Sequence, residues 1–127
     1  STSRGLGDVY KRQVYKLGDM FGRGRAVPQD KSKAYRLYER SLELVRDDVE
    51  FVQPAIRIAA MLLTPMPPPA ASTVIPYALT LYQRTEIGLR IDIANGMTYY
   101  TKRLREAIEG QEKARKLVEM DDFVIDR

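Results

Sequence analysis

The sequence of 127 residues contains neither cysteine nor histidine. Without cysteine the chain has no disulfide, no thiol nucleophile and no thiolate metal ligand, while the periplasm and the cytoplasm both stay open as compartments. Without histidine it has no Ser-His-Asp triad, no His-Glu-x-x-His zinc site and no imidazole acid or base near neutral pH. Catalysis would depend on carboxylate, lysine or tyrosine side chains alone. We therefore expect no enzyme, no catalytic residue, no cofactor and no metal.

The sequence also has no long block of one charge sign and no apolar run long enough to span a bilayer. Basic residues concentrate at 23–40 and 102–116, but glutamates are interleaved with them at spacings of three and four residues. That pattern is typical of a solvated helix face, whereas a nucleic-acid site normally carries one sign. Binding of phosphate or nucleic acid is therefore a lesser alternative. The acidic cluster Asp47-Asp48-Glu50 is typical of the start of a helix.

What the sequence does contain is an internal repeat. The pattern Ala-x-x-Leu-Tyr-x-Arg-Ser/Thr occurs at residues 34–41 and again at 78–85, and every matched pair is 44 residues apart. A period of about 20 to 50 residues is typical of solenoids, in which a unit too small to bury its own apolar face stacks on its neighbours. Such proteins mostly hold other proteins, so the repeat favours a scaffold over a catalyst.

Both copies of the pattern predict a helix. Apolar or small residues form one helical stripe in each copy, at 34, 37, 38, 41, 42 and 45 and at 78, 81, 82, 85 and 89. Before the first copy, the glycines and proline of residues 22–28 break the chain, and Asp30 is placed to cap the next helix. Tyr38 and Tyr82 occupy the stripe, so we expect their rings in the core. The predicted unit is helix, turn, helix.

Residues 17–34 read Leu-Gly-Asp-Met-Phe-Gly-Arg-Gly-Arg-Ala-Val-Pro-Gln-Asp-Lys-Ser-Lys-Ala. This segment resembles a Sel-one-like repeat, a relative of the tetratricopeptide repeat, except that Phe21 replaces a tyrosine and Ala26 is an extra residue. The resemblance extends to Leu44 and implies an all-α protein, an α-solenoid of two to three helix-turn-helix repeats. Small residues would let paired helices approach closely, with leucines filling the gap between them. The residues expected to carry the repeat structure are Leu17, Gly18, Gly22, Gly24, Asp30, Ala34, Leu37, Tyr38, Ala78, Leu81 and Tyr82.

The sequence predicts a repeat domain over residues 14–120, with units at about 14–46, 49–89 and 91–120, followed by a C-terminal tail at 121–127. In the second unit the proline-rich stretch 64–73 predicts a stiff extended connection, because proline disfavours helix. In the third unit we expect a first helix at 91–102 and a second at 104–120. The stretch 104–117 resembles the terminal helix that often closes such arrays.

Residues 1–13 stand apart, because Leu6-Gly-Asp-Val-Tyr-Lys-Arg-Gln13 resembles a translated sequencing adapter joined to a truncated reading frame. We expect this segment to be a non-native scar that is disordered or irrelevant to the fold. The natural chain would then begin near Val14 and would be the C-terminal part of a longer repeat protein. The segment carries +2 of the formal charge of +4, so the rest of the chain has little basic excess.

The resemblance implies a protein-interaction scaffold or adaptor, in which the first helix of each pair lines a concave groove that receives a peptide or a folded partner. From the sides of the first helices away from the apolar stripe, we select Arg57, Met61, Asn95 and Tyr99 as partner-binding residues. Tyr99 and its neighbour Tyr100 cannot face the same side of a helix, so we expect one to pack and the other to face outward. The competing class is an accessory or regulatory domain of a larger enzyme. We expect no membrane insertion.

Overall fold

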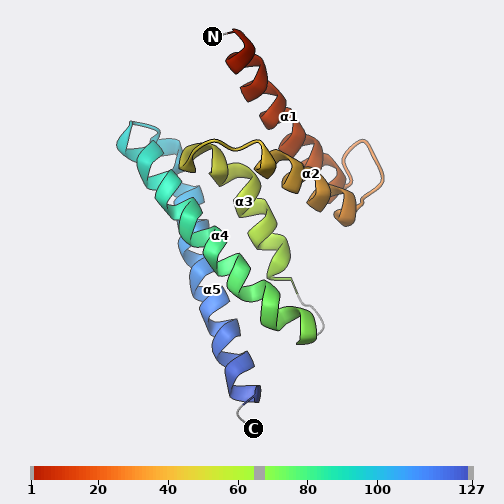
Figure 1. The fold of residues 1–127 in the computed structure, drawn as a ribbon, viewed down its shortest axis with the longest axis vertical. Coiled ribbons are helices and arrows are strands. Elements are labelled where there is room, and N and C mark those ends of the chain that lie inside the picture. Colours follow the sequence, from red (N-terminus) through yellow and green to blue (C-terminus); the bar gives the residue numbers. More distant parts are fainter. Residues whose placement is uncertain (1, 65–67, 126–127) are drawn as a thin grey trace. The chain divides into compact units, whose positions relative to one another are not determined.

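The structure is a computed structural model that describes the backbone of residues 2–64 and 68–125 and the side chains of residues 7, 9–64 and 74–120. Over these ranges the chain is helical and has no strand, which confirms the predicted all-α class. The elements are α1 (Thr2–Arg23), α2 (Lys31–Glu43), α3 (Asp48–Leu62), α4 (Pro68–Ala94), the 3-10 helix η1 (Thr98–Tyr100) and α5 (Thr101–Ile125) (Figure 1). None of the described helices combines the length and apolarity that a bilayer span requires.

The chain divides into two compact units, Ser1–Arg46 and Asp47–Arg127. This division coincides with the predicted boundary between the first two repeat units. The boundary predicted near residue 90 falls inside α4, which continues to Ala94. Residues 91–120 therefore do not form a helix pair of their own.

Unit 1 is the helix pair α1 and α2. The loop between them turns sharply at Gly24 and Ala26, whose φ angles are +71° and +62°, and glycine adopts the first of these without strain. The Asp30 N–H donates to the carbonyl of Phe21 at 2.9 Å, which closes the loop. The Asp30 side chain accepts a hydrogen bond from the Lys33 N–H at 2.9 Å. Asp30 is thus the N-cap of α2, as the sequence predicted.

The two helices of unit 1 approach most closely where α1 carries Gly18. A Cβ built on Gly18 would lie 2.6 Å from the Tyr38 ring and 3.3 Å from the Ala34 carbonyl oxygen, so this position requires glycine. Ala34, Tyr38 and Ser41 are buried on α2, which confirms part of the predicted stripe. Leu37 and Leu42 are half-buried, and Val45 lies beyond the end of the helix. Leu17 was expected to fill the gap between the helices, but it is 41% exposed. Leu37, the other leucine expected there, is half-buried, and the Tyr38 ring is the side chain that lies against Gly18.

Residues 1–13 were predicted to be disordered or irrelevant to the fold, and this prediction is wrong for residues 2–13. They form the first half of α1, and the buried Ser41 hydroxyl donates to the Lys11 carbonyl oxygen at 3.2 Å. Val14, where the repeat domain was expected to begin, lies inside α1 and is buried. The apolar spacing of α1 extends to the N-terminal side of residue 14, so the helix begins well before the expected start of the repeat domain.

Unit 2 contains α3, α4 and α5, and α4 packs on both of the others. The side chain of Asp47 caps α3 by accepting the Glu50 N–H at 2.8 Å. All five stripe positions predicted for the second repeat copy are buried, from Ala78 to Leu89. The rest of the apolar core comes from all three helices: Phe51, Val52, Ala55, Ile56, Ile58, Ala59, Leu62, Leu63, Ile75, Ala107 and Ala114.

The extended connection predicted at 64–73 is wrong over residues 68–73, where α4 has already begun. Two prolines open this helix, Pro68 and Pro69. Proline is tolerated in the first turn because the N–H groups there have no partner within the helix. Residues 65–67 of the predicted connection lie outside the described part of the chain.

The helix predicted at 91–102 is also wrong. α4 ends at Ala94, Gly96 takes a φ of +99°, and the Asn95 N–H bonds back to the carbonyl of Ile91 at 3.1 Å. An Asn-Gly pair with a left-handed glycine is a common helix stop, and here it outweighs the apolar spacing that continues through it. After η1, the single helix α5 runs through the second predicted helix and into the predicted tail, as far as Ile125.

Candidate functional site

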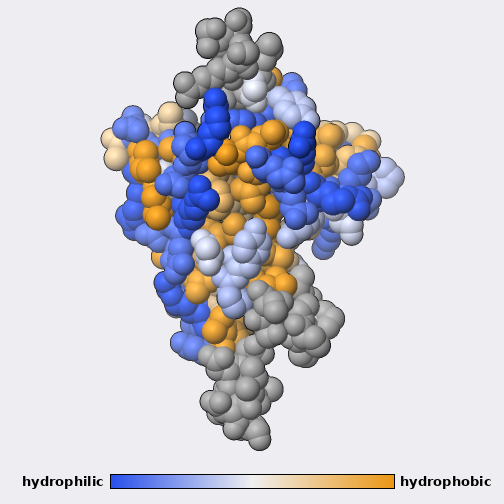
Figure 2. All heavy atoms as spheres, viewed as in Figure 1, coloured by the Kyte–Doolittle hydropathy of each residue, from blue (hydrophilic) through white to orange (hydrophobic). Residues whose placement is uncertain are grey.

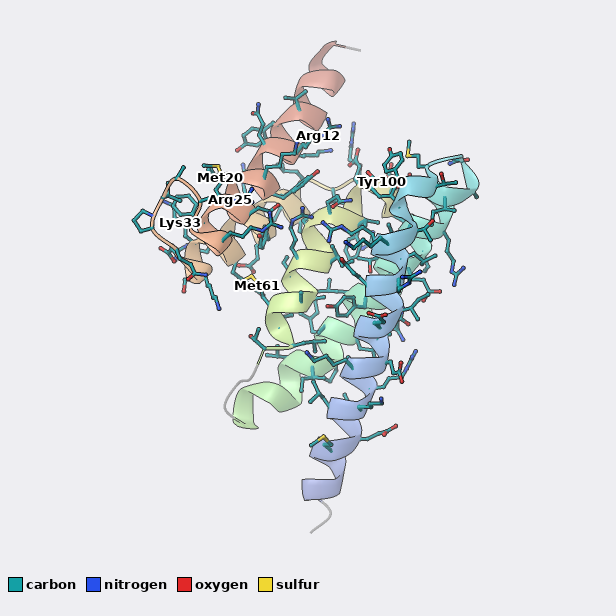
Figure 3. All side chains as sticks on the ribbon, turned by 180° about the vertical axis from the view of Figure 1, so that it is seen from behind. Arg12, Met20, Arg25, Lys33, Met61 and Tyr100 are labelled. Atoms are coloured by element: carbon teal, nitrogen blue, oxygen red, sulfur yellow. The ribbon has the colours of Figure 1, made fainter. Side chains whose placement is uncertain are left out.

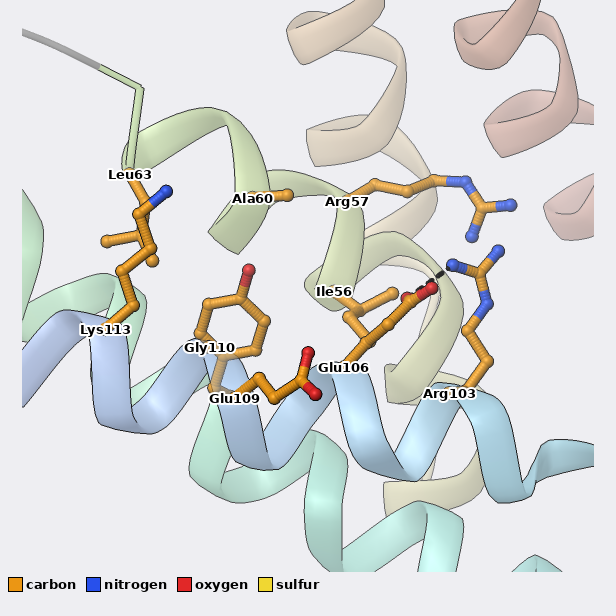
Figure 4. Close-up of a pocket in the computed structure, with 10 residues that line it drawn as sticks. Ile56, Arg57, Ala60, Leu63, Arg103, Glu106, Glu109, Gly110 and Lys113 are labelled. Carbon is orange, nitrogen blue, oxygen red and sulfur yellow. Dashed lines mark hydrogen bonds and ion pairs between the residues drawn. The ribbon is translucent and has the colours of Figure 1, made fainter.

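A cavity of about 340 Å³ lies in unit 2 between α3 and α5. Its volume is in the usual range for small binding pockets. We call it the Tyr82 cavity, after the α4 residue that lines it (Figure 4). Its remaining lining comes from the two flanking helices: Ile56, Arg57, Ala60 and the C-cap residue Leu63 from α3, and Arg103, Glu106, Glu109, Gly110 and Lys113 from α5.

The inner part of the Tyr82 cavity is apolar and firmly packed. Ile56, Leu63 and Tyr82 line it, yet each is less than 8% exposed. The hydroxyl-bearing end of the Tyr82 ring lies directly over Gly110, where a Cβ would overlap ring carbons. Glycine at this position of α5 thus lets the ring sit between the two helices.

Charged side chains form the rim of the cavity. Arg103 and Glu106 make an ion pair at 2.8 Å, and Arg57 donates to the Gln53 side chain at 2.8 Å. In Figure 4, the guanidinium groups of Arg57 and Arg103 lie together at one end and the Lys113 amine lies at the other. Neither Glu109 nor Lys113 makes an ion pair or side-chain hydrogen bond within the described residues.

The Tyr82 hydroxyl is the one polar group of the inner cavity. It has no hydrogen-bond partner among the described residues. Among the described side chains, no nitrogen or oxygen atom is both fully buried and without a hydrogen-bond partner. The unpaired Tyr82 hydroxyl is therefore partly accessible to solvent, and it is accessible through the cavity that Tyr82 lines. Burial, and next the negative charge of Glu106, raise the pKa of Tyr82 above its ordinary value. The group is therefore a neutral hydrogen-bond donor at physiological pH.

A polar network fixes α5 on α4 behind the cavity. The buried Gln111 donates to Glu86 at 2.6 Å, and Arg90 donates to the other oxygen of the same carboxylate at 2.8 Å. These two hydrogen bonds lower the pKa of Glu86, the one from Gln111 most. The network sets the rotation of α5 that turns Gly110 toward Tyr82 and Lys113 toward the cavity.

Of the four partner-binding residues selected from the sequence, the structure places only Arg57 on the cavity. Met61 is on α3 but points away from α5 (Figure 3). Asn95 and Tyr99 are exposed in the turn between α4 and α5, where Tyr99 is 72% exposed. Tyr99 contacts the half-buried Tyr100, with 4.6 Å between the ring centroids, so one tyrosine faces outward as expected.

The sequence reasoning missed the cavity's central residue because Tyr82 was assigned to the core alone. A glycine inside the helical pattern at residue 110 was an available signal, since isolated helical glycines often mark a close approach. The acidic and basic rim residues of α5 gave no such signal, because their alternation is also that of an ordinary solvated helix.

Figure 2 shows charged and apolar side chains mixed across one face. Exposed apolar residues of α4 include Tyr77, Ile87 and Ile91, which are 41% to 53% exposed. Within the described residues, no group of His, Cys, Asp or Glu side chains could hold a metal ion.

One buried acid lies outside the cavity, near the start of α3. Asp92 is 6% exposed, and its carboxylate makes no hydrogen bond or ion pair within the described part of the chain. Burial, and next the charge of Asp47, raise the pKa of Asp92. Its ionised form therefore destabilises the fold at neutral pH.

Replacing Asp92 with asparagine is expected to stabilise the protein at pH 7, by on the order of 1 kcal/mol. Because the pKa of Asp92 is higher in the folded than in the unfolded protein, the buried charge lowers the free energy of unfolding by its full amount above the folded-state pKa. Below the unfolded value of about 3.9 the carboxyl is protonated in both states, and this destabilisation is absent. The gain should therefore shrink as the pH falls toward 4. Urea unfolding of both proteins at pH 7, 5 and 4 measures it, and a gain that is independent of pH would contradict this origin.

Comparisons of the chain with models of protein families, with curated proteins and with solved structures found no match.

Proposed function

We propose that this chain is a protein-interaction module, built as an α-solenoid of Sel-one-like helix pairs, and that the Tyr82 cavity is its binding site. The observation that carries the proposal is the cavity itself, which two helices flank while both pack on a third. An apolar floor with a charged rim is the usual make-up of a site that takes the side chains of a partner.

The repeated pattern supports the same proposal. Ala34 and Ala78 are both fully buried, Tyr38 and Tyr82 are both 6% exposed, and each ring lies over a helical glycine. In each unit, the copy of the pattern thus buries its alanine and packs its tyrosine ring on a glycine of a neighbouring helix. Helix pairs that share one packing rule can be stacked, which is the principle of a solenoid.

The test of this function is a variant that fills the cavity without disturbing the fold. Ala60 is exposed and lines the cavity, so arginine at this position has room to point into it. We expect Ala60→Arg to weaken by about tenfold or more the binding of peptides selected on the wild-type protein from a random display library. Fluorescence anisotropy with the synthetic peptides measures the effect.

The matched control is Gln83→Arg, which adds the same side chain at an exposed position of α4 outside the cavity. Circular dichroism should show both variants folded. If the library yields no peptide that prefers the wild-type protein to Ala60→Arg, the proposed binding site is wrong.

A further inference from the structure

The two repeated tyrosines differ in one respect, which is what their hydroxyl groups bond to. Tyr38 donates to the Asp19 carboxylate at 2.6 Å, and Asp19 is the residue next to the glycine beneath the ring. In unit 2 the residue after Gly110 is Gln111, and its amide is committed to Glu86. The Tyr82 hydroxyl therefore has no carboxylate where Tyr38 has one.

The charges beside Tyr82 favour an incoming carboxylate at that place. On α5, the residues one turn before and one turn after Gly110 are Glu106 and Lys113, which lie on the same helix face. Glu106 is already paired with Arg103. Neither Lys113 nor Glu109 has an ion-pair partner among the described residues. The lining as a whole carries three cations, Arg57, Arg103 and Lys113, against two carboxylates, Glu106 and Glu109, which leaves one positive charge in excess.

The size of the cavity indicates how the carboxylate arrives. A volume of about 340 Å³ holds a few side chains, whereas a whole helix is about 10 Å across and does not fit into it. The apolar floor formed by Ile56 and Leu63 would remain wet if a lone carboxylate bound there. An occupant that covers both the floor and the hydroxyl carries an acidic and an apolar side chain close together.

We propose that the Tyr82 cavity recognises a short segment of a partner protein in which an Asp or Glu side chain lies next to a large apolar one. The carboxylate accepts the hydrogen bond of the Tyr82 hydroxyl and pairs with Lys113, as Asp19 accepts from Tyr38 in unit 1. The apolar side chain covers Ile56 and Leu63. This inference rests on the proposed function, because it names the partner chemistry of the same site.

The experiment starts from a display library of random seven-residue peptides selected on the immobilised full chain. Enriched peptides should carry an acid beside Leu, Ile, Met or Phe. The best of them is then synthesised in two forms, with its Glu (or Asp) and with Gln (or Asn) at the same position. Anisotropy titrations of both forms are run against the wild type and against Tyr82→Phe, Lys113→Gln and Tyr38→Phe.

With the wild-type protein, the amide form should bind about tenfold more weakly than the acid form. The amide oxygen still accepts from the Tyr82 hydroxyl, but it lacks the negative charge that strengthens this hydrogen bond and pairs with Lys113. With Tyr82→Phe or Lys113→Gln this ratio should fall toward one. Tyr38→Phe is the matched control: it should leave the ratio unchanged but lower the Tm by a few degrees, since it removes the bond to Asp19. Tyr82→Phe should not lower the Tm, because its hydroxyl has no protein partner to lose.

Three outcomes would overturn the inference. In the first, acid and amide forms bind the wild type equally; in the second, Tyr82→Phe keeps the full ratio. Either result, with binding still sensitive to Ala60→Arg, leaves the interaction module in place and removes only the carboxylate. In the third, free glutamate or succinate displaces the peptide at equal concentration, and the occupant is then a small carboxylate rather than a protein segment. A library that yields no cavity-dependent peptide contradicts the proposed function itself.

Discussion

Replacing Gly88 with alanine is expected to destabilise the protein by about 3 kcal/mol: overpacking against backbone of about 4 kcal/mol, above the usual range, less about 1 kcal/mol of gained helix preference. Gly88 lies where α4 crosses the first turn of α3, and a Cβ there would overlap the backbone carbonyl oxygen of Asp48. The same Cβ would lie 2.6 Å from a methyl group of Val52, which is 1% exposed and has no space to move. A backbone carbonyl in a capped helix start cannot turn aside, so the two helices must separate.

Thermal unfolding measures this effect, and a loss of about 3 kcal/mol corresponds to a Tm lower by about 10 °C for a chain of this size. The control is Gly22→Ala on α1, where the new methyl group would be 3.5 Å from Ala34, an ordinary contact. That change should be neutral or stabilising by up to about 1 kcal/mol, because alanine favours helix. If both variants have the wild-type Tm, the close crossing of α3 and α4 is wrong.

The parts of this fold that the sequence predicted are those encoded by local spacing. The stripe that begins at Ala78 predicts the buried face of the middle of α4, and the structure confirms all five of its positions. The stripe that begins at Ala34 is confirmed at its three buried positions on α2. Asp30 precedes a helix with the short polar side chain that capping requires, and it caps α2. Each of these features depends on residues within one or two turns of one another.

The errors arise where two local signals compete. Proline marks the connection before α4, but the same residue type is accepted in a first turn, so the start of the helix could not be read from it. At Asn95-Gly96 the apolar spacing predicts that the helix continues, whereas the turn residues predict that it ends. The helix ends there, because Gly96 adopts a left-handed conformation. Residues 2–13 form half of α1 although their sequence resembles an adapter, because the origin of a segment does not determine whether it is helical.

The Tyr82 cavity could not be predicted because Tyr82 and the glycine beneath its ring are far apart in the chain. Their spacing also differs from that of the corresponding tyrosine and glycine in unit 1. The glycine beneath Tyr38 comes 20 residues before it, at Gly18, whereas the glycine beneath Tyr82 comes 28 residues after it, at Gly110. The repeated pattern therefore specifies a ring over a glycine but not which neighbouring helix supplies the glycine. The packing of α5 against α4 determines which helix supplies the glycine beneath Tyr82, and the same packing forms the cavity.

Gly110→Ala is the second change with a large expected effect, because it acts on stability and on binding together. The new methyl group would overlap the Tyr82 ring, and the ring is held between α3 and α5 with 6% of its surface exposed. Overpacking of about 3 kcal/mol, reduced by about 1 kcal/mol of gained helix preference, leaves a loss of about 2 kcal/mol. The cheapest movement for the ring is into the cavity, so peptide binding should fall with it.

Gly18→Ala separates these two effects, since its methyl group meets the Tyr38 ring in the same manner but in unit 1. It should cost a similar free energy of unfolding and leave the affinity for the selected peptides unchanged. A double-mutant cycle tests whether overlap with the Tyr82 ring causes the loss of stability. Tyr82→Leu should lower the free energy of unfolding by at least about 1 kcal/mol less in the Gly110→Ala background than in the wild type, because it removes the overlap. Additive costs, or an equal loss of peptide affinity in Gly18→Ala, would show that the ring does not link α5 to the cavity.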